Sequence, residues 1–237
     1  MPTLWTVLRY SVFAISLACV TVGSAATNIS RPLIVVSDGN VWQYNGRTKS
    51  DRPQRLTLWA HNWGPSLSVN ARFMVYASDA RRAVETCEER DDCGGIDLPS
   101  NIWLRDLNTN RSIRIADQPK GDPIKFGIQR SRPTWSPNGA SIAWTEIQGS
   151  SDHSSIYRLA VYSLASGSTT FRRLYVSLPG SGRDDQRDVF VPDPIIWGEV
   201  GIVLPVSNES GGSQYATALL LEPNGVFRRL KIGRAHV

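Results

Sequence analysis

Short runs of alternating apolar and polar residues recur along this chain and are separated by turn signals. The clearest run covers residues 141–145, where Ile142 and Trp144 fall on one side and smaller or polar residues fall on the other. This period of two is typical of a β-strand. Pro133 stands at the start of a second strand pattern, where no amide hydrogen is required. Residues 132–146 therefore predict two strands joined by a tight turn.

The turn itself reads Ser136-Pro137-Asn138-Gly139. These residue types predict a type I turn, because serine caps the backbone, proline presets φ, asparagine tolerates the bridge region and glycine accepts the exit geometry. Turn geometry alone explains Ser136 and Asn138. We therefore assign these four residues a structural role and no catalytic one.

A weaker copy of this hairpin begins at Pro65, and a third, blurred copy begins at Pro194. The third copy lacks the Ser-Pro-Asn-Gly sequence, and its turn falls at residues 198–201. The first two copies agree at six offsets: Pro65, Leu67, Ser68, Asn70, Met74 and Tyr76 match Pro133, Trp135, Ser136, Asn138, Ile142 and Trp144. This recurrence predicts a repeat protein.

A second element recurs after each hairpin. It is clear at residues 40–44 and 101–105, which share an Asn-x-Trp pattern, and fainter at 157–164 and 218–221. Each copy is followed by a polar turn and a basic, partly apolar strand, at residues 55–57, 111–115, 171–174 and 227–230. The order predicts antiparallel sheets of four strands, repeated about four times.

These repeats resemble those of TolB-like, WD40-like (PD40) β-propellers, in which a Trp-Ser-Pro-Asp-Gly turn precedes an Ile-Ala-Phe strand. Here Asn138 stands in place of the family's aspartate and Trp144 in place of its phenylalanine. The resemblance covers residues 32–230. It implies an all-β fold, a β-propeller of four-stranded antiparallel blades, with about four blades in an incomplete ring. It transfers no catalytic residue, because propeller families share few functional positions.

The spacing of the copies predicts insertions. Pro65 and Pro133 lie 68 positions apart, whereas a propeller blade takes about 40–50 residues. The candidate insertions are rich in Gly, Ser, Asp, Pro or charge and cover residues 87–100, 118–130, 148–154 and 180–188. They are interpreted as tolerated surface loops or, alternatively, as a decorated binding face.

The first 26 residues predict a secretory signal peptide. Arg9 precedes an apolar stretch at 10–22, and small residues follow at 23–26. This places the protein outside the cytoplasm, as a periplasmic, cell-surface or secreted protein. The alternatives that attach it to a membrane are an uncleaved signal anchor and lipidation of Cys19.

Cys87 and Cys93 remain once the signal is removed, and an oxidising compartment predicts a local disulfide between them. The acidic residues around them, Glu88, Glu89, Asp91, Asp92 and Asp97, suggest a cation site as an alternative. Their spacing differs from that of a calcium loop, so a solvated acidic loop is favoured and no metal site is assigned.

The last six residues, 232–237, read Ile-Gly-Arg-Ala-His-Val and resemble a translated sequencing adapter. We therefore expect the propeller to occupy residues 27–231 and the native protein to continue beyond Lys231.

Charge gives no reason to expect nucleic-acid binding. The formal net charge is +5, and arginine pairs such as Arg172-Arg173 lie scattered among predicted strands instead of forming a stripe. The sequence also contains no nucleophile elbow, zinc-protease helix, phosphate loop or dinucleotide fingerprint. No catalytic or cofactor-binding residue is assigned.

His61, between Trp59 and Trp63, is compatible with a ligand pocket but more typical of a packed, hydrogen-bonded histidine. Three functions remain open. The favoured one is a non-enzymatic scaffold that binds a protein or cell-envelope component. The alternatives are the N-terminal propeller of a prolyl-oligopeptidase-type serine peptidase whose hydrolase domain is missing, and a carbohydrate-binding propeller suggested by the eight tryptophans.

Overall fold

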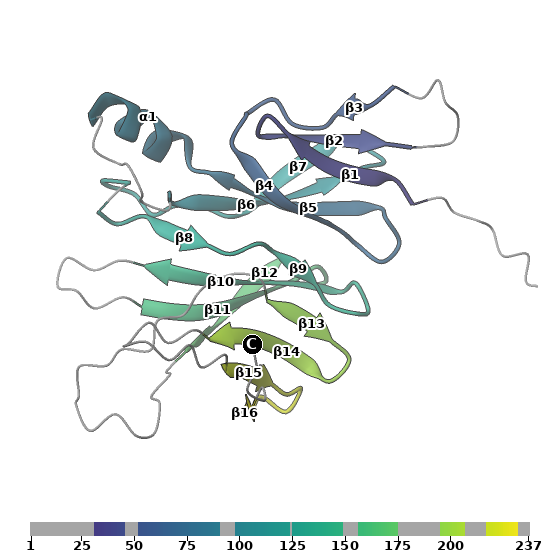
Figure 1. The fold of residues 1–237 in the computed structure, drawn as a ribbon, viewed down its shortest axis with the longest axis vertical. Helices are drawn as coiled ribbons and strands as arrows, with labels where there is room; N and C mark the ends of the chain where they lie inside the picture. The colour runs from purple at the N-terminus through teal and green to yellow at the C-terminus, as the bar shows by residue number, and fades with distance from the viewer. Residues whose placement is uncertain are drawn as a thin grey trace, which may run out of the picture.

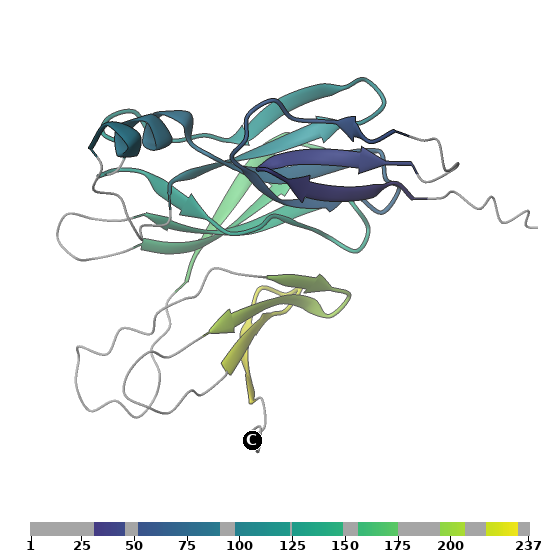
Figure 2. The same cartoon turned by 45° about the horizontal axis from the view of Figure 1, so that its top comes forward.

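The computed structural model describes residues 31–45, 52–90, 98–123, 125–148, 156–174, 195–206 and 217–231. The predicted signal peptide, the adapter-like tail, Cys19 and Cys93 lie outside these ranges, so the predictions made for them stay predictions. Four antiparallel sheets follow one another along the chain (Figure 1). In both views the first two sheets lie at one end of the molecule and the fourth at the other (Figure 2).

In three of the four sheets each strand pairs with its neighbours in sequence. The first contains β1 (Leu33–Ser37), β2 (Asn40–Tyr44) and β3 (Gln54–Arg55), and the second contains β4 (Asn62–Leu67), β5 (Phe73–Asp79), β6 (Ser100–Asp106) and β7 (Arg111–Ala116). The third contains β8 (Ile128–Arg130), β9 (Thr134–Trp135), β10 (Ser141–Gln148), β11 (Ile156–Ser163) and β12 (Ser168–Arg173). In this third sheet β8 and β9 both pair with β10. The fourth contains β13 (Ile196–Gly198), β14 (Gly201–Val206), β15 (Thr217–Leu221) and β16 (Phe227–Lys231).

The Ser136 turn has the predicted hydrogen bonds. The amide of Gly139 donates to the carbonyl oxygen of Ser136 at 2.9 Å, and Gly139 takes a φ of 68°. The hydroxyl of Ser136 accepts from the amide of Ser141 at 2.9 Å and donates to Oδ1 of Asn138 at 2.7 Å. These contacts join the two strands on either side of the turn.

The copy between β4 and β5 repeats this geometry. The amide of Ala71 donates to the carbonyl oxygen of Ser68 at 2.9 Å, and the Ser68 hydroxyl binds Asn70 Oδ1 at 2.7 Å. Ala71 takes a φ of 54° at the position that glycine holds in the other copy. The two hairpins are therefore copies of one unit in three dimensions, as the sequence predicted.

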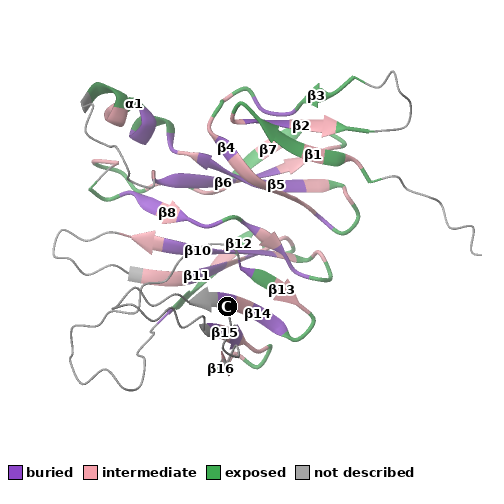
Figure 3. Ribbon diagram, in the orientation of Figure 1, coloured by how far each residue is buried: buried purple, intermediate pink, exposed green. Residues whose placement is uncertain are grey.

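The middle sheets bury both faces. In β5, Met74 and Tyr76 pack against the first sheet, while Val75 and Ala77 pack against the third. A further core lies between the third and fourth sheets, around Leu159 and Leu204. Buried residues accordingly gather on the facing strands of successive sheets (Figure 3). Sheets that stack face to face around successive cores are the blades of a β-propeller. Within the described ranges these blades form no closed ring.

Three details differ from the predictions. The first blade has three strands instead of four. Residues 81–90 form a helix, α1 (Arg81–Arg90), which the analysis of strand periodicity did not predict. Residues 128–130, which we assigned to a loop insertion, form β8. This strand lies at the same edge of the sheet as β9 and pairs with the end of β10 that β9 does not reach. Among the described residues, no helix is long and apolar enough to cross a membrane.

Candidate functional site

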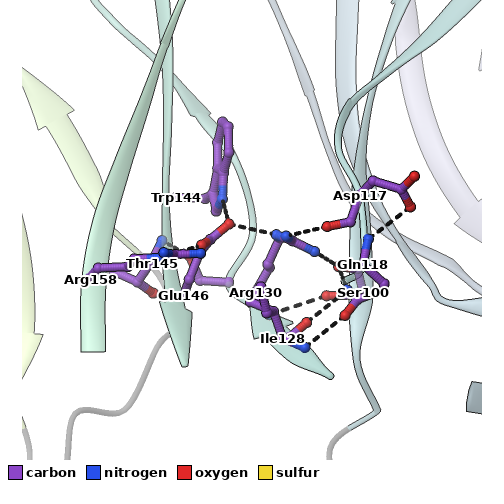
Figure 4. Close-up of polar contacts among 10 residues, drawn as sticks. Ser100, Asp117, Gln118, Ile128, Arg130, Trp144, Thr145, Glu146 and Arg158 are labelled. Carbon is purple, nitrogen blue, oxygen red and sulfur yellow. Dashed lines mark hydrogen bonds and ion pairs between the residues drawn. The ribbon is translucent and has the colours of Figure 1, made fainter. Parts of the chain in front are cut away.

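Two polar regions lie against the second blade. The first is an ion-pair cluster, here defined as Arg130, Trp144, Glu146 and Arg158 (Figure 4). Arg130 Nε donates to Glu146 Oε1 at 2.7 Å, and Arg158 Nε donates to Glu146 Oε2 at 2.6 Å. Trp144 Nε1 donates to Glu146 Oε1 at 2.9 Å. The carboxylate of Glu146 is therefore bound through both of its oxygens.

The ion-pair cluster also joins the second and third blades. Arg130 donates to the carbonyl oxygens of Ser100 and Asp117, the latter at 2.8 Å. The Gln118 side chain donates to the Ser100 carbonyl oxygen at 2.6 Å and accepts from the Ile128 amide at 2.7 Å. Figure 4 shows these contacts as one network between strands of two sheets. Among the described residues no strand of the second sheet pairs with a strand of the third, so this network connects the two blades.

Within the ion-pair cluster, burial and charge have opposite effects on the pKa of Glu146. Burial alone raises the pKa of Glu146, but the charges of Arg130 and Arg158 and the hydrogen bonds from Trp144 and Arg130 outweigh it and hold that pKa below its ordinary value. Glu146 is thus ionised at neutral pH. Because its oxygens are all engaged, the ion-pair cluster serves as an interblade connection and offers no group for chemistry.

The second region is a cavity of about 760 Å³ on the face of the second blade that looks toward the first. We call it the basic aromatic cavity. Its lining includes three aromatic side chains and five cationic ones: Trp59, Tyr76 and Trp103, with Arg81, Arg82, Arg105, Arg114 and Lys120. The size is that of a small-molecule or peptide site.

Strand periodicity accounts for this lining. Tyr76 and Ser78 are two apart in β5, and Asn101, Trp103 and Arg105 are two apart in β6, so each set points to one face of the sheet. The first blade covers this face only in part, because β3 has two residues whereas β7, its counterpart in the second blade, has six. Helix α1 and the segment 56–59 complete the wall.

The positive charges of the cavity are only partly neutralised. Arg114 pairs with Asp117 at 2.8 Å. Arg105 donates to the neutral oxygens of Ser112 at 3.1 Å and Asn110 at 3.3 Å. Burial raises the pKa of Tyr76, so its phenol is neutral. Arg81 pairs with Glu85 at 2.7 Å, and the lining also contains the carboxylates of Asp79 and Asp117. The cavity therefore combines an excess of cationic side chains with aromatic surface.

Three polar atoms on residues that line the basic aromatic cavity are buried without a hydrogen-bond partner in the described part of the chain. They are Trp59 Nε1, Asn101 Oδ1 and Arg105 Nε, and the Asn101 residue is only 7% exposed. Buried polar atoms are nearly always paired, because an unpaired one costs about 1–3 kcal/mol. All three atoms are covered by the surrounding protein atoms in this structure.

A second cavity of about 700 Å³ lies between the third and fourth blades, near Trp197 and Arg172. Within the described ranges, none of its lining residues contains an unpartnered buried polar atom. Ser136, Pro137 and Asn138 lie on its wall, but their polar groups are used in the turn. We interpret it as a gap between blades.

The sequence alone left open whether His61 lies in a ligand pocket or is a packed, hydrogen-bonded histidine. Its ring lies 4.6 Å from that of Trp59, and its Nδ1 lies 3.7 Å from Asp79 Oδ2. Trp63 Nε1 donates to the same carboxylate at 3.0 Å. Trp59 lines the basic aromatic cavity, while His61 packs beside it. Asn101 and Arg105 were missed as site residues, although the Asn-x-Trp pattern that contains them was recognised as a strand.

Cys87 lies in α1, and its predicted partner Cys93 is outside the described residues, so the disulfide stays a prediction. Among the described residues, no group of three or more His, Cys, Asp or Glu side chains is arranged to hold a metal ion.

Similarity to known proteins is found in structure and not in sequence. No family model and no curated protein matches the sequence. Among solved structures, the chain is similar to the β-propeller domain of the Trilobed protease from Pyrococcus furiosus, at 12% identity and a TM-score of 0.46, over 84% of this chain and 52% of that one. It is also similar to the tricorn protease, at 13% identity and a TM-score of 0.42, over 81% of this chain and 17% of that one. A third similar structure is an acylaminoacyl peptidase in complex with Z-Gly-Gly-Phe-chloromethyl ketone, at 11% identity and a TM-score of 0.46, over 84% of this chain and 30% of that one.

The chain spans about half or less of the length of these three structures. With TM-scores below 0.5, the similarity carries no argument about fold or function. The class of protein is defined by the blades themselves: this chain is a β-propeller.

Proposed function

We propose that this chain is a non-enzymatic, extracytoplasmic binding propeller and that the basic aromatic cavity is its ligand site. The observation that carries the proposal is the composition of the cavity lining, in which five cationic and three aromatic side chains surround a space of about 760 Å³. The ion-pair cluster is the contrasting case, because its buried charges are fully paired within the protein.

A carbohydrate ligand is less well supported. Sugars stack on open aromatic faces, but Arg81 lies over the ring of Trp59 at 5.5 Å and Arg114 lies over that of Trp103 at 5.6 Å. The peptidase hypothesis remains open, and the DNA beyond the Lys231 codon tests it. A nucleophile elbow there would support a peptidase, whereas further repeats would support a binding scaffold.

The proposal is tested with the purified chain and a set of anionic, neutral and cationic aromatic compounds. At 100 times its dissociation constant, a compound bound only by the folded state raises the melting temperature by roughly 5–10 °C. The rise is expected in wild type and in Trp197→Leu, which alters the second cavity, and is expected to vanish in Trp59→Leu. If no compound stabilises the protein, or if Trp59→Leu responds like wild type, the cavity is not a ligand site.

A further inference from the structure

The five cations that line the basic aromatic cavity differ in how far the protein itself neutralises them. Arg105 is held toward the turn between β6 and β7 by hydrogen bonds to Ser112 and Asn110. Arg81 pairs along its own helix with Glu85, which lies outside the cavity lining. These two arginines are therefore engaged within the chain, and three cations remain for a ligand.

Arg82 and Lys120 are the free cations of the cavity. Both are exposed, and within the described part of the chain neither forms an ion pair. Arg82 belongs to the first turn of α1, whereas Lys120 lies in the segment that follows β7. Because the two charges come from different elements, a ligand does not have to bring them together. An extended ligand with several negative groups can pair with each of them separately.

Arg114 already holds a carboxylate at the cavity wall. It lies 2.8 Å from Asp117 Oδ2, and the two side chains are 44% and 55% exposed. Such exposed ion pairs add little to stability, so a carboxylate from a ligand can replace that of Asp117 at small cost. The Arg114 guanidinium also lies over the ring of Trp103 at 5.6 Å, an arrangement in which it keeps its N–H groups for acceptors.

The charge of the lining favours an acidic ligand. Its five cations face two carboxylates, those of Asp79 and Asp117, and Asp79 accepts a hydrogen bond from Trp63 Nε1 at 3.0 Å. A nucleic acid fits less well, because its bases stack on uncovered aromatic faces. In this cavity, guanidinium groups lie over the rings of both Trp59 and Trp103.

From this arrangement we infer that the basic aromatic cavity binds an acidic peptide segment, whose separate carboxylates pair with Arg82, Lys120 and Arg114. Asp117 then competes with the peptide for Arg114. This inference rests on the proposed function, since it names the ligand class of the same cavity.

Three peptides of equal length, acetylated and amidated at their ends, test the ligand class by isothermal titration calorimetry. We expect N-acetyl-Glu-Glu-Glu-Glu-amide to bind about tenfold more tightly than its all-Gln counterpart, because only the carboxylates form charge-assisted hydrogen bonds. The all-Lys counterpart should not bind. Added salt should weaken binding of the Glu peptide, since the charges that attract it are exposed. An oligothymidylate is the nucleic-acid comparison.

Two cation variants test the contacts. Arg82→Met and Lys120→Met are each expected to weaken binding of the Glu peptide about threefold. Arg111→Met is the matched control, because it removes the same charge from an exposed position of β7 outside the cavity lining and should leave the affinity unchanged. Near-ultraviolet circular dichroism checks that each variant is folded.

Asp117→Asn tests the competition at Arg114. Removing the competing charge should tighten binding of the Glu peptide about threefold and leave the Gln peptide unaffected. The backbone carbonyl oxygen that accepts from Arg130 is retained in this variant. Glu199→Gln removes the same charge in the fourth blade and should change neither affinity. An unchanged affinity in Asp117→Asn would contradict the exchange at Arg114.

The outcomes separate the inference from the proposed function. The inference fails if the Gln peptide binds as well as the Glu peptide, if Arg111→Met weakens binding as much as the cavity variants, or if the oligothymidylate binds more tightly. If the peptides do not bind but other compounds bind in a Trp59-dependent manner, the inference fails and the binding site stands. If no peptide and no other compound binds, both fail.

Discussion

Arg130 Nε and Glu146 Oε1 lie 2.7 Å apart, between side chains that are only 3% and 1% exposed. This pair connects β8 to β10 within the third blade, and Arg130 extends the connection to the carbonyl oxygens of the second blade. A buried ion pair of this kind adds little stability over apolar packing, but it is costly to break. Its role is to set how two blades face each other.

Replacing Glu146 with Gln is expected to destabilise the protein by about 3–5 kcal/mol, because it leaves the Arg130 charge buried without a counter-charge. Urea unfolding measures the change. Glu199→Gln, at an exposed glutamate in the turn between β13 and β14, is the control and should leave the midpoint nearly unchanged. A similar small effect of both substitutions would show that the pair does not hold the blades together.

Acid should weaken the fold through Glu146. Its pKa is lowered in the folded state from a model-compound value of 4.5, so the unfolded chain takes up the proton at a higher pH. The resulting stabilisation is complete above that value and is lost as the pH falls from about 4.5 through the lower folded pKa. Unfolding free energies measured between neutral and acid pH should fall less steeply in Glu146→Gln than in wild type. Equal slopes would contradict this assignment.

Opposite substitutions at the matching positions of the two repeated turns should have opposite effects on stability. Ala71→Gly should stabilise the protein by roughly 1 kcal/mol, because alanine pays a steric penalty at its φ of 54°. Gly139→Ala should destabilise it by about 1–2 kcal/mol through backbone strain alone, since no atom lies within 3.8 Å of the added carbon. Thermal unfolding measures both. Ala140→Gly, at a residue whose φ is not positive, is the control and should not stabilise the fold.

Asn40 and Asn101, which both precede an apolar residue and a tryptophan in the third strand of their blades, should differ in their contribution to stability. Asn40→Leu removes a side chain whose amide and carbonyl groups are both hydrogen-bonded, so it should destabilise the protein by about 1–3 kcal/mol. Asn101→Leu removes an unpaired buried oxygen and should be nearly neutral or stabilising. Chemical denaturation of both variants measures the difference. An equal loss in both would mean that Asn101 has a structural partner.

The cysteines provide a test of compartment. If the chain is exported, Cys87 and Cys93 should be linked, and neither should react with iodoacetamide until a reductant is added. Mass spectrometry of peptides from secreted or periplasmic protein measures this. Free thiols in exported protein would contradict the predicted disulfide and weaken the argument for an oxidising compartment.

Local pattern alone determined much of this fold. The alternation around Trp144, the Ser136 turn and its copy at Ser68, and the Asn-x-Trp strands specified strands, turns and their repetition, because a strand's period and a turn's dihedral preferences act between residues close in sequence. Helix α1 was not predicted: only its end, from residue 87, fell in a predicted insertion, and the helix buries only a short apolar stretch that includes Ala83 and Val84.

The candidate site was decided by tertiary structure. Nothing near Asn101 in the sequence shows that β3 is too short to cover the neighbouring face, or that Trp59 from the preceding blade segment reaches the same cavity. The sequence by itself determined most of the strands and the alternation of their side chains between two sheet faces, but not β8 or helix α1. Which polar atoms find partners depends on how two blades pack, because hydrogen bonding and burial are set by atoms that are distant in the chain and meet only in the folded protein.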